Sequence, residues 1–301
     1  MMHFLSVEDF SKAQIEEIFD IADDLKKNKA PISLKQGSIA VLLFEKPSTR
    51  TRISFEVAMA QLGGHYIYVD PRTTQLSRGE NWADTAKVLS SYVDFIIARL
   101  YSHKDLNEMA KNSSVPVINA LTEDEHPTQA LADLYTIREK KGKLKGLKIA
   151  MFGDTANNTF NSLMIACTMM GMEVALIGPK GYLPSTRFVA KAKEYGIVKV
   201  YDDIEEGVEG ADVIYTDTFV SMGEEHDSEL RKKLFMPYQV NGTVLKMASP
   251  RAIVMHPLPA HRGEEITGEV LDGKQSVAFD QAKLKLLIEK AIILYIAGKE
   301  I

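Results

Sequence analysis

The densest group of side chains suited to chemistry lies at residues 48–52, where hydroxyls alternate with arginines. The segment reads STRTR; it follows an apolar run at 38–44 and leads into a helical pattern at 51–62. A helix N-terminus offers free backbone N–H groups and partial positive charge, hydroxyls add donors, and the fork of Arg50 suits bidentate contact with phosphate. The pattern predicts a phosphate site. The alternative is a Ser/Thr helix cap beside two solvated arginines.

A second group, HPTQ at residues 126–129, opens another predicted helix. His126 and Gln129 are three residues apart, so they face the same way, and both can donate a hydrogen bond to a carbonyl oxygen. Arg99 follows an apolar strand pattern at 93–98, which places a charge at the carboxyl end of a strand. These residues suit the binding of a carbonyl group. The alternatives are a histidine near a helix cap with a surface glutamine, and an arginine that extends to solvent.

The second half of the chain carries three further groups. Asn157 and Asn158 open a helix with more amide groups than a cap needs. Asp217 follows a strand end, where a carboxylate can hold an ammonium group or simply start a turn. The segment HPLPAHRGEE at 256–265 contains two prolines that fix an irregular backbone, so it either aims carbonyls at a ligand or forms a rigid connection. No G-x-G-x-x-G is present, which argues against a nucleotide-cofactor dehydrogenase.

Strand-length apolar runs alternate with helical patterns through both halves. Runs that are apolar on both faces are typical of parallel sheets covered on both sides, and the alternation indicates doubly wound α/β domains. We expect the active site at the carboxyl ends of the strands. We expect two such domains with helices on both faces, at 1–141 and 142–278, with the C-terminal helix 279–301 returning to the first domain. The predicted strands are 38–44, 65–69, 93–98, 115–119, 147–152, 173–177, 198–201, 213–216 and 253–256; the predicted helices are 11–27, 51–62, 82–90, 104–111, 127–141, 157–170, 185–195 and 279–297.

Composition limits the class of protein. The chain has 301 residues, 45% hydrophobic and 26% charged, with a net charge of −5 and no basic tract, so nucleic acid is not an expected partner. The N-terminus lacks a signal-peptide pattern, and the apolar run at 284–297 is too short and too charged to span a membrane. The single cysteine, Cys167, cannot form an intrachain disulfide and fits a reducing compartment. We therefore expect a cytoplasmic protein.

Taken together, the motifs STRTR, HPTQ and H-x-L-P, in this order and at these separations, resemble the aspartate/ornithine carbamoyltransferase family over essentially the whole chain. The resemblance implies carbamoyl transfer without a metal or organic cofactor, and a cis bond between Leu258 and Pro259. It also implies that four residues act directly on the carbamoyl group: Arg50, Thr51, Arg99 and His126. The carbamoyl phosphate site that it implies comprises Ser48, Thr49, Arg50, Thr51, Gln75, Arg99, His126, Gln129, Pro257, Leu258 and Arg262.

The predicted acceptor is L-ornithine, which would give L-citrulline and phosphate in arginine biosynthesis. Four residues resemble the acceptor site of the ornithine branch: Asn158, Asp217, Ser221 and Met222. The aspartate branch needs arginines to bind a second carboxylate, and residues 217–225 contain none. The reacting end of the acceptor should therefore be cationic. The alternative acceptors are another amine such as putrescine or an acylated ornithine.

Two positions depart from the ornithine branch, which usually has cysteine at Pro257 and often tryptophan at Phe219. The aspartate branch has proline at the first position and still transfers carbamoyl groups, so we expect an effect on the acceptor rather than loss of chemistry. We interpret Phe219 as a packing change. A non-catalytic binding or regulatory protein is the remaining alternative.

The segment TTQLSRGEN at 73–81 resembles the family loop that reaches into the site of a neighbouring subunit. It implies a homotrimer, or a multiple of trimers, with Gln75 contributing to the neighbouring site. The alternative is a surface loop.

Overall fold

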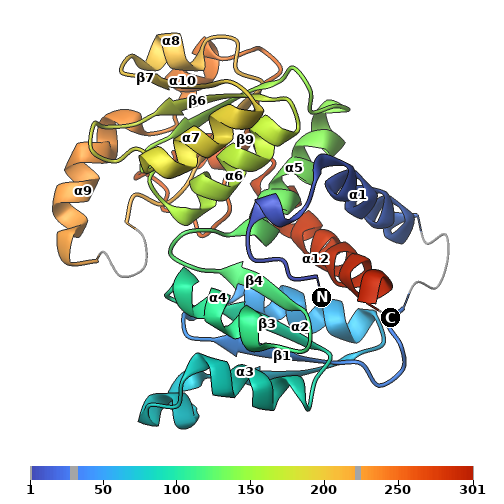
Figure 1. Cartoon of the computed structure of the whole chain (residues 1–301). Helices are drawn as coiled ribbons and strands as arrows, with labels where there is room; N and C mark the ends of the chain where they lie inside the picture. Colours follow the sequence, from blue (N-terminus) through green and yellow to red (C-terminus); the bar gives the residue numbers. More distant parts are fainter. Residues whose placement is uncertain (1, 28–32, 221–224, 301) are drawn as a thin grey trace. The chain divides into compact units, whose positions relative to one another are not determined.

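The computed structural model describes residues 2–27, 33–220 and 225–300, and the chain divides into two compact units (Figure 1). Unit 1 comprises Met1–Ala132 and Leu284–Ile301, and unit 2 comprises Asp133–Lys283. Each unit contains one fully parallel sheet with helices. The predicted class, two parallel-sheet α/β domains with a C-terminal helix that returns to the first, is confirmed.

Unit 1 is built on a four-stranded sheet in the order β2-β1-β3-β4. The apolar run that was predicted as a central strand is β1, which lies between β2 and β3. The strands are β1 (Ile39–Phe44), β2 (His65–Val69), β3 (Phe95–Arg99) and β4 (Val117–Leu121). The helices are α1 (Lys12–Lys26), α2 (Arg50–Gln61), α3 (Trp82–Ser90) and α4 (His103–Asn112), and short 3-10 turns lie at η1 (Val7–Asp9), η2 (Pro71–Thr73) and η3 (Gln75–Arg78).

The core of unit 1 follows from the apolar strands. Helices α3 and α4 pack together on one face of the sheet, where Leu106 and Met109 contact apolar side chains of β1 and β3. The strand β4 runs two residues further than predicted, because Asn119 is fully buried within it. The Asn119 side chain donates to the Leu5 carbonyl at 2.8 Å and accepts from the Leu121 N–H at 2.9 Å, so a polar residue is tolerated there.

Unit 2 has a five-stranded sheet in the order β7-β6-β5-β8-β9. The chain moves outward from β5 to β7 and then returns to the other side of β5, which creates a switch point between β5 and β8. The strands are β5 (Lys148–Phe152), β6 (Glu173–Ile177), β7 (Val198–Tyr201), β8 (Val213–Thr216) and β9 (Ile253–Met255). The longer helices are α6 (Asn158–Met169) and α7 (Thr186–Tyr195).

Four short helices of unit 2 were not predicted, because one or two turns are too short to show a helical period. They are α8 (Ile204–Val208), α9 (Ser228–Phe235), α10 (Gly242–Met247) and α11 (Gly268–Leu271), with 3-10 turns at η4 (Glu225–Asp227) and η5 (Met236–Tyr238). The division between the units falls within α5 (Pro127–Lys141) and α12 (Ala278–Glu300).

Buried hydrogen bonds hold Asp133, the first residue of unit 2, in place. The Asp133 carboxylate accepts one hydrogen bond from the Tyr215 hydroxyl and one from the Gln281 amide, each at 2.7 Å. All three residues are fully buried. Burial, followed by the charge of Asp133, raises the pKa of Tyr215 well above its usual value, so its hydroxyl remains a donor. Among the described residues, no helix is long and apolar enough to cross a membrane.

Candidate active site

The predicted phosphate segment opens α2 directly after β1, as expected. The backbone N–H of Thr51 donates to the Ser48 hydroxyl at 3.2 Å, so Ser48 satisfies one N–H at the start of α2, as the cap interpretation expects of a hydroxyl there. Thr51 is buried, Ser48 is half-buried, and Thr49 and Arg50 are exposed. The cap and phosphate interpretations are compatible, because the remaining N–H groups of the first turn and the exposed guanidinium lie at the same helix end.

Arg99 lies beside this segment because β3 pairs with β1. Phe44 is in register with Arg99, and the next residue, Glu45, donates its N–H to the Arg99 carbonyl at 2.9 Å. Arg99 is only 5% exposed, and its Nε atom is buried without a hydrogen-bond partner among the described residues. Burial, and then the nearby charge of Arg50, lowers the pKa of Arg99 to about 10. Arg99 is therefore a buried hydrogen-bond donor with a second positive charge, that of Arg50, nearby. An anionic ligand would satisfy the donor and offset both charges.

The HPTQ motif supplies a neutral histidine at the start of α5. His126 and Gln129 are both buried, at 5% and 3% exposure. Burial, followed by the charges of Lys285 and Arg99, lowers the pKa of His126 well below its usual value. At neutral pH the imidazole is therefore uncharged, and it can donate one hydrogen bond without bringing a further positive charge.

One residue of this group, Lys285 on α12, was missed by the sequence analysis. Its Nζ donates to the Thr51 hydroxyl and to the Gln129 side-chain oxygen, each at 2.9 Å, so it joins the first two motifs. Lys285 is buried at 5% exposure. The signal was a lysine and a glutamate, Lys285 and Glu289, at helical spacing within a stripe that is otherwise apolar.

Unit 1 therefore gathers positive charge around buried donors. Arg50, Arg99 and Lys285 supply three cations, and the pKa shifts of Arg99 and His126 show that these charges act on one another. A carboxylate, Glu289, also lies beside Lys285, with its Oε1 3.9 Å from Lys285 Nζ. A group of cations suits a phosphate dianion, and neutral donors such as Thr51 suit a carbonyl oxygen.

The predicted Gln75 lies elsewhere on unit 1. It begins η3, its side chain is exposed, and no hydrogen bond between described residues joins it to the cationic group. The turn is held by Thr74, whose hydroxyl accepts from the Leu76 N–H at 3.2 Å. The role of Gln75 across a subunit boundary stays a prediction.

In unit 2, two residues predicted to bind the acceptor, Asn158 and Asp217, lie beside the switch point of the sheet, after β5 and β8. Asn157 caps α6 and its amide nitrogen lies 3.5 Å from Oδ2 of Asp217, which follows β8. Oδ1 of Asp217 accepts from the Thr218 N–H at 2.8 Å. Asn158 is half-buried in the next position. A carboxylate beside amide groups suits an ammonium or amine ligand; the predicted Ser221 and Met222 lie outside the described residues.

The 256–265 segment is held by a buried histidine and glutamate. The ring of His256 accepts from the Leu258 N–H at 2.8 Å through Nδ1, so its Nε2 is placed to donate to Glu265, at 3.1 Å. Burial acts to raise the pKa of Glu265, but hydrogen bonds from His256 and from the His261 N–H hold it below the usual value. This network sets the backbone at Pro257 and Leu258.

The Leu258–Pro259 bond is cis, which confirms the prediction. Leu258 also has a φ of 59°, in the left-handed region that a branched side chain rarely occupies. Such backbone strain is often found where a loop presents groups to a ligand. Arg262, predicted to approach the same ligand, forms an ion pair with Asp272 at 2.9 Å and is half exposed, so its ligand contact stays a prediction.

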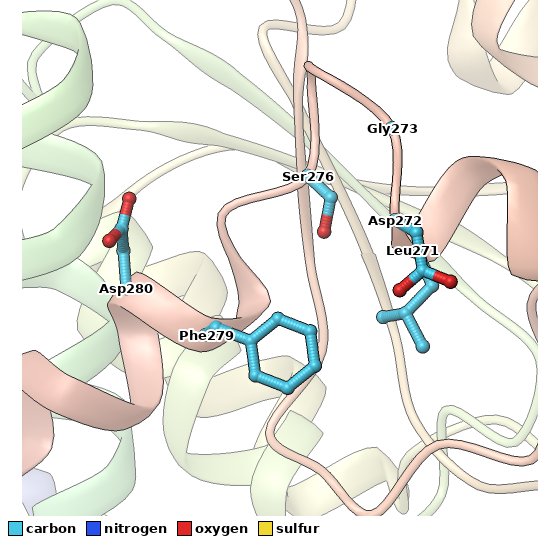
Figure 2. A pocket seen from close by; sticks show the side chains of 6 residues that line it. All are labelled: Leu271, Asp272, Gly273, Ser276, Phe279 and Asp280. Atoms are coloured by element: carbon cyan, nitrogen blue, oxygen red, sulfur yellow. The ribbon is translucent and has the colours of Figure 1, made fainter.

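Two other features of unit 2, a cavity and a cluster of possible metal ligands, resemble binding sites. A cavity of about 330 Å³ in unit 2 is lined by Leu271, Asp272, Gly273, Ser276, Phe279 and Asp280 (Figure 2). None of the predicted site residues lines it, and its two carboxylates are paired with Arg262 and Lys140. It therefore offers little to an anionic substrate.

Of the described residues, His261, Glu264 and Glu265 place possible metal ligands within 4.8 Å of one another. The Glu264 carboxylate contacts Lys232 at 2.7 Å, and Glu265 is held by His256. One oxygen of each carboxylate therefore already has a protein donor, although Glu265 Oε2 has no hydrogen-bond partner among the described residues. The contacts of Glu264 and Glu265 with Lys232 and His256 favour a structural network.

Comparison with known proteins gives the family. Residues 2–139 match the aspartate/ornithine carbamoyltransferase carbamoyl-P binding domain, and residues 145–296 match the Asp/Orn binding domain of the same family. The ornithine carbamoyltransferase of Thermococcus kodakarensis is 47% identical over 302 residues, covering 98% of this chain and 96% of the relative. The anabolic ornithine carbamoyltransferase of Pyrococcus furiosus is 46% identical, with the same coverage of both chains.

Solved structures agree with this. The ornithine carbamoyltransferase structure from Pyrococcus furiosus has a TM-score of 0.93 at 46% identity, covering 98% of this chain and 97% of that chain. The anabolic ornithine carbamoyltransferase structure from Campylobacter jejuni has a TM-score of 0.92 at 38% identity, covering 99% and 100%. The chain belongs to the aspartate/ornithine carbamoyltransferase family. Within that family, the relatives named here are ornithine carbamoyltransferases, which confirms the resemblance that the motifs indicated.

Proposed function

We propose that the protein transfers the carbamoyl group of carbamoyl phosphate to the side-chain amine of L-ornithine, giving L-citrulline and phosphate. The observation that carries the phosphate half of this proposal is the buried Arg99, whose unpartnered Nε lies beside the cationic start of α2. The acceptor half is supported by relatives of 46–49% identity that are named ornithine carbamoyltransferase.

Carbamoyl phosphate would bind through its phosphate group first. The N–H groups at the start of α2, the hydroxyls of Ser48 and Thr49, and the guanidinium of Arg50 would hold the phosphate oxygens. Arg99 would supply its buried Nε–H to the same ligand. Lys285 would add an ammonium from the side of Thr51 and Gln129.

The carbonyl oxygen of the ligand would face donors that become more effective as charge develops. The neutral amine of the acceptor attacks the carbonyl carbon and forms a C–N bond, and negative charge grows on the carbonyl oxygen. Arg50, Thr51, Arg99 and His126 are proposed to stabilise that charge. The C–O bond to phosphate then breaks, and the proton lost by the attacking nitrogen passes to the departing phosphate or to water.

The carbamoyl amino group needs acceptors, and we propose the backbone carbonyls near Pro257 and Leu258 for this role. The strained backbone of Leu258 and the network of His256 with Glu265 support it, because both fix the direction of those carbonyls. Gln129, Gln75 and Arg262 are proposed as further contacts to carbamoyl phosphate.

We propose that L-ornithine binds through Asn158, Asp217, Ser221 and Met222. The Asp217 carboxylate at the switch point supports a cationic acceptor. Putrescine or an acylated ornithine remains the alternative, because Pro257 stands where the ornithine branch usually has cysteine. Residues 1–141 with 279–301 would then form the domain that binds carbamoyl phosphate, and residues 142–278 the domain that binds ornithine.

We further propose a cytoplasmic homotrimer, or a multiple of trimers, that acts in arginine biosynthesis. The edge strand β2 and the neighbouring helix α2 expose large apolar side chains: Tyr66 is 41% exposed, and Ile67 and Ile53 are each 51% exposed. Apolar groups along an open sheet edge favour a contact with another subunit. The anabolic relatives support the biosynthetic direction.

The test is an assay with radiolabelled carbamoyl phosphate and a panel of amines: ornithine, N-acetylornithine, putrescine and aspartate. We expect labelled citrulline from ornithine and little product from the others. The variant Arg50→Ala should lose about 100-fold or more in activity, because a charge-assisted bidentate contact is removed. No product from any amine, with folded protein and saturating carbamoyl phosphate, would contradict the proposal; product from putrescine alone would select the alternative.

A further inference from the structure

Glu289 is a buried carboxyl group that the reaction scheme above does not use. It follows Lys285 by one helical turn on α12, with 3.9 Å between Lys285 Nζ and Glu289 Oε1. Glu289 is fully buried, and neither of its oxygens has a hydrogen-bond partner among the described residues. A carboxylate without donors is costly inside a protein, so this group has reason to bind a proton.

The surroundings of Glu289 place one cation next to it and the remaining cations farther toward the phosphate site. Lys285 contacts it on α12, and Ser54, whose hydroxyl donates to the Thr51 carbonyl at 3.2 Å, faces it from α2. The charge of Lys285 also reaches His126 at the start of α5, which is acted on by Arg99 from β3 as well. Lys290, the next basic residue of α12, donates to the Gln61 side chain at 2.9 Å.

The pKa of Glu289 lies within the pH range that a binding measurement can cover. Burial raises its pKa to about 8, while the ammonium of Lys285, and then the Ser54 hydroxyl, act in the opposite direction. Lys285 thus has two sets of partners: Glu289 on one side, and Thr51 with Gln129 on the other. An anion that arrives beside Thr51 and Gln129 will compete with Glu289 for the same ammonium.

We propose that Glu289 is a positioning residue that couples carbamoyl phosphate binding to the uptake of one proton. The inference rests on the proposed function, since it needs a phosphate dianion at the start of α2. In the free protein at about pH 8 and above, the ionised Glu289 carboxylate balances Lys285. When the dianion binds, it takes over that balance, and Glu289 receives a proton from solvent to form the neutral acid. The buried group of Lys285, Glu289 and ligand then never carries an extra negative charge.

The expected uptake follows from the fraction of Glu289 that is ionised before binding. With a pKa of about 8, roughly half a proton is taken up at about pH 8 and roughly nine-tenths at about pH 9. At about pH 6.5 the carboxyl is already protonated, and uptake should be close to zero. An ionised ligand that is a dianion throughout this range adds no proton of its own.

Isothermal titration calorimetry in pairs of buffers with different ionisation enthalpies measures this uptake directly. Freshly dissolved carbamoyl phosphate is titrated into the whole protein, with inorganic phosphate as a stable second ligand at the two higher pH values. Glu289→Gln should bind the ligand with near-zero uptake at every pH. The control Glu16→Gln changes a side chain of α1 that is 55% exposed, and should retain the wild-type uptake.

Each outcome decides between the two proposals. If wild type and Glu289→Gln bind carbamoyl phosphate with equal uptake, the inference is overturned while the proposed function stands. If the wild type binds neither ligand, the proposed function itself fails. Glu289→Asp provides a second test that keeps the carboxyl group: it should retain pH-dependent uptake with a shifted midpoint, whereas a role in packing alone would leave no uptake in either wild type or variant.

Discussion

Replacing Arg99 by methionine should make the free protein more stable and abolish its activity. Methionine has similar length and no charge, so it removes a buried guanidinium whose Nε–H has no hydrogen-bond partner in the part of the chain that the structure describes. The fall in the pKa of Arg99 from its ordinary value to about 10 corresponds to about 3 kcal/mol of unfavourable charge burial. This penalty is fully present at neutral pH, where the side chain is charged in both states, and is relieved only as the pH rises above 10.

The chain contains a convenient probe for this measurement. Trp82, the single tryptophan, begins α3 in the same unit as Arg99, so its fluorescence follows the unfolding of unit 1 in urea. We expect the free energy of unfolding of Arg99→Met to exceed that of the wild type by about 1–3 kcal/mol. Saturating carbamoyl phosphate should stabilise the wild type by about 2.7 kcal/mol at a concentration 100 times its Kd, and should leave the variant unchanged.

Two controls separate the charge from the shape of the side chain. Arg99→Lys keeps a buried cation and should gain no stability. Lys111→Met removes an exposed cation from α4 and should change stability by less than about 0.5 kcal/mol. If Arg99→Met were less stable than the wild type by 1 kcal/mol or more, Arg99 would be a structural residue and the argument from its unpartnered donor would be wrong.

Two more predictions concern buried polar groups. Tyr215→Phe should destabilise unit 2 by about 1.5–3 kcal/mol, because the Asp133 carboxylate loses a donor at 2.7 Å; a loss below about 0.5 kcal/mol in urea unfolding followed by circular dichroism would refute this. His126→Gln should reduce the loss of stability on acidification. Because the pKa of His126 is lowered in the folded protein, the unfolded chain binds more protons below about pH 6.5. Wild-type stability therefore falls as the pH drops through that range, by at most about 1.4 kcal/mol per pH unit. The variant should show a shallower fall in urea midpoint between about pH 8 and pH 5.

Local patterns predicted those parts of the fold that short segments determine. The apolar run of β1 is buried on both faces, so its composition alone indicated a central parallel strand. The helix predicted at 11–27 begins where Ser11 accepts a hydrogen bond from the Gln14 N–H, a cap formed by residues close in sequence. The hydroxyl and arginine pattern at the start of α2 likewise depends on neighbours in sequence.

Other features depend on contacts between distant residues, which no local pattern encodes. Lys285 lies 234 positions after Thr51 in sequence, yet its Nζ contacts the Thr51 hydroxyl. The partner of His256, Glu265, is identified only once the backbone between them is folded. The predicted strand 115–119 ended at Asn119, but β4 continues to Leu121, and a carbonyl from Leu5 accepts from the Asn119 amide inside the strand. Sequence reasoning was weakest where a polar group is satisfied by a remote segment.

The return of α12 to unit 1 has a consequence for synthesis of the chain. The ribosome releases the first 132 residues long before Lys285 and the buried apolar side chains Ile288, Ile292 and Ile296 are translated. Until then, the phosphate site of the nascent chain lacks Lys285, and the apolar surface that α12 covers is exposed. A premature stop codon ahead of position 285 would therefore remove an ammonium from the phosphate site. The truncated chain would also keep this apolar surface exposed, which makes it a target for chaperones and proteases.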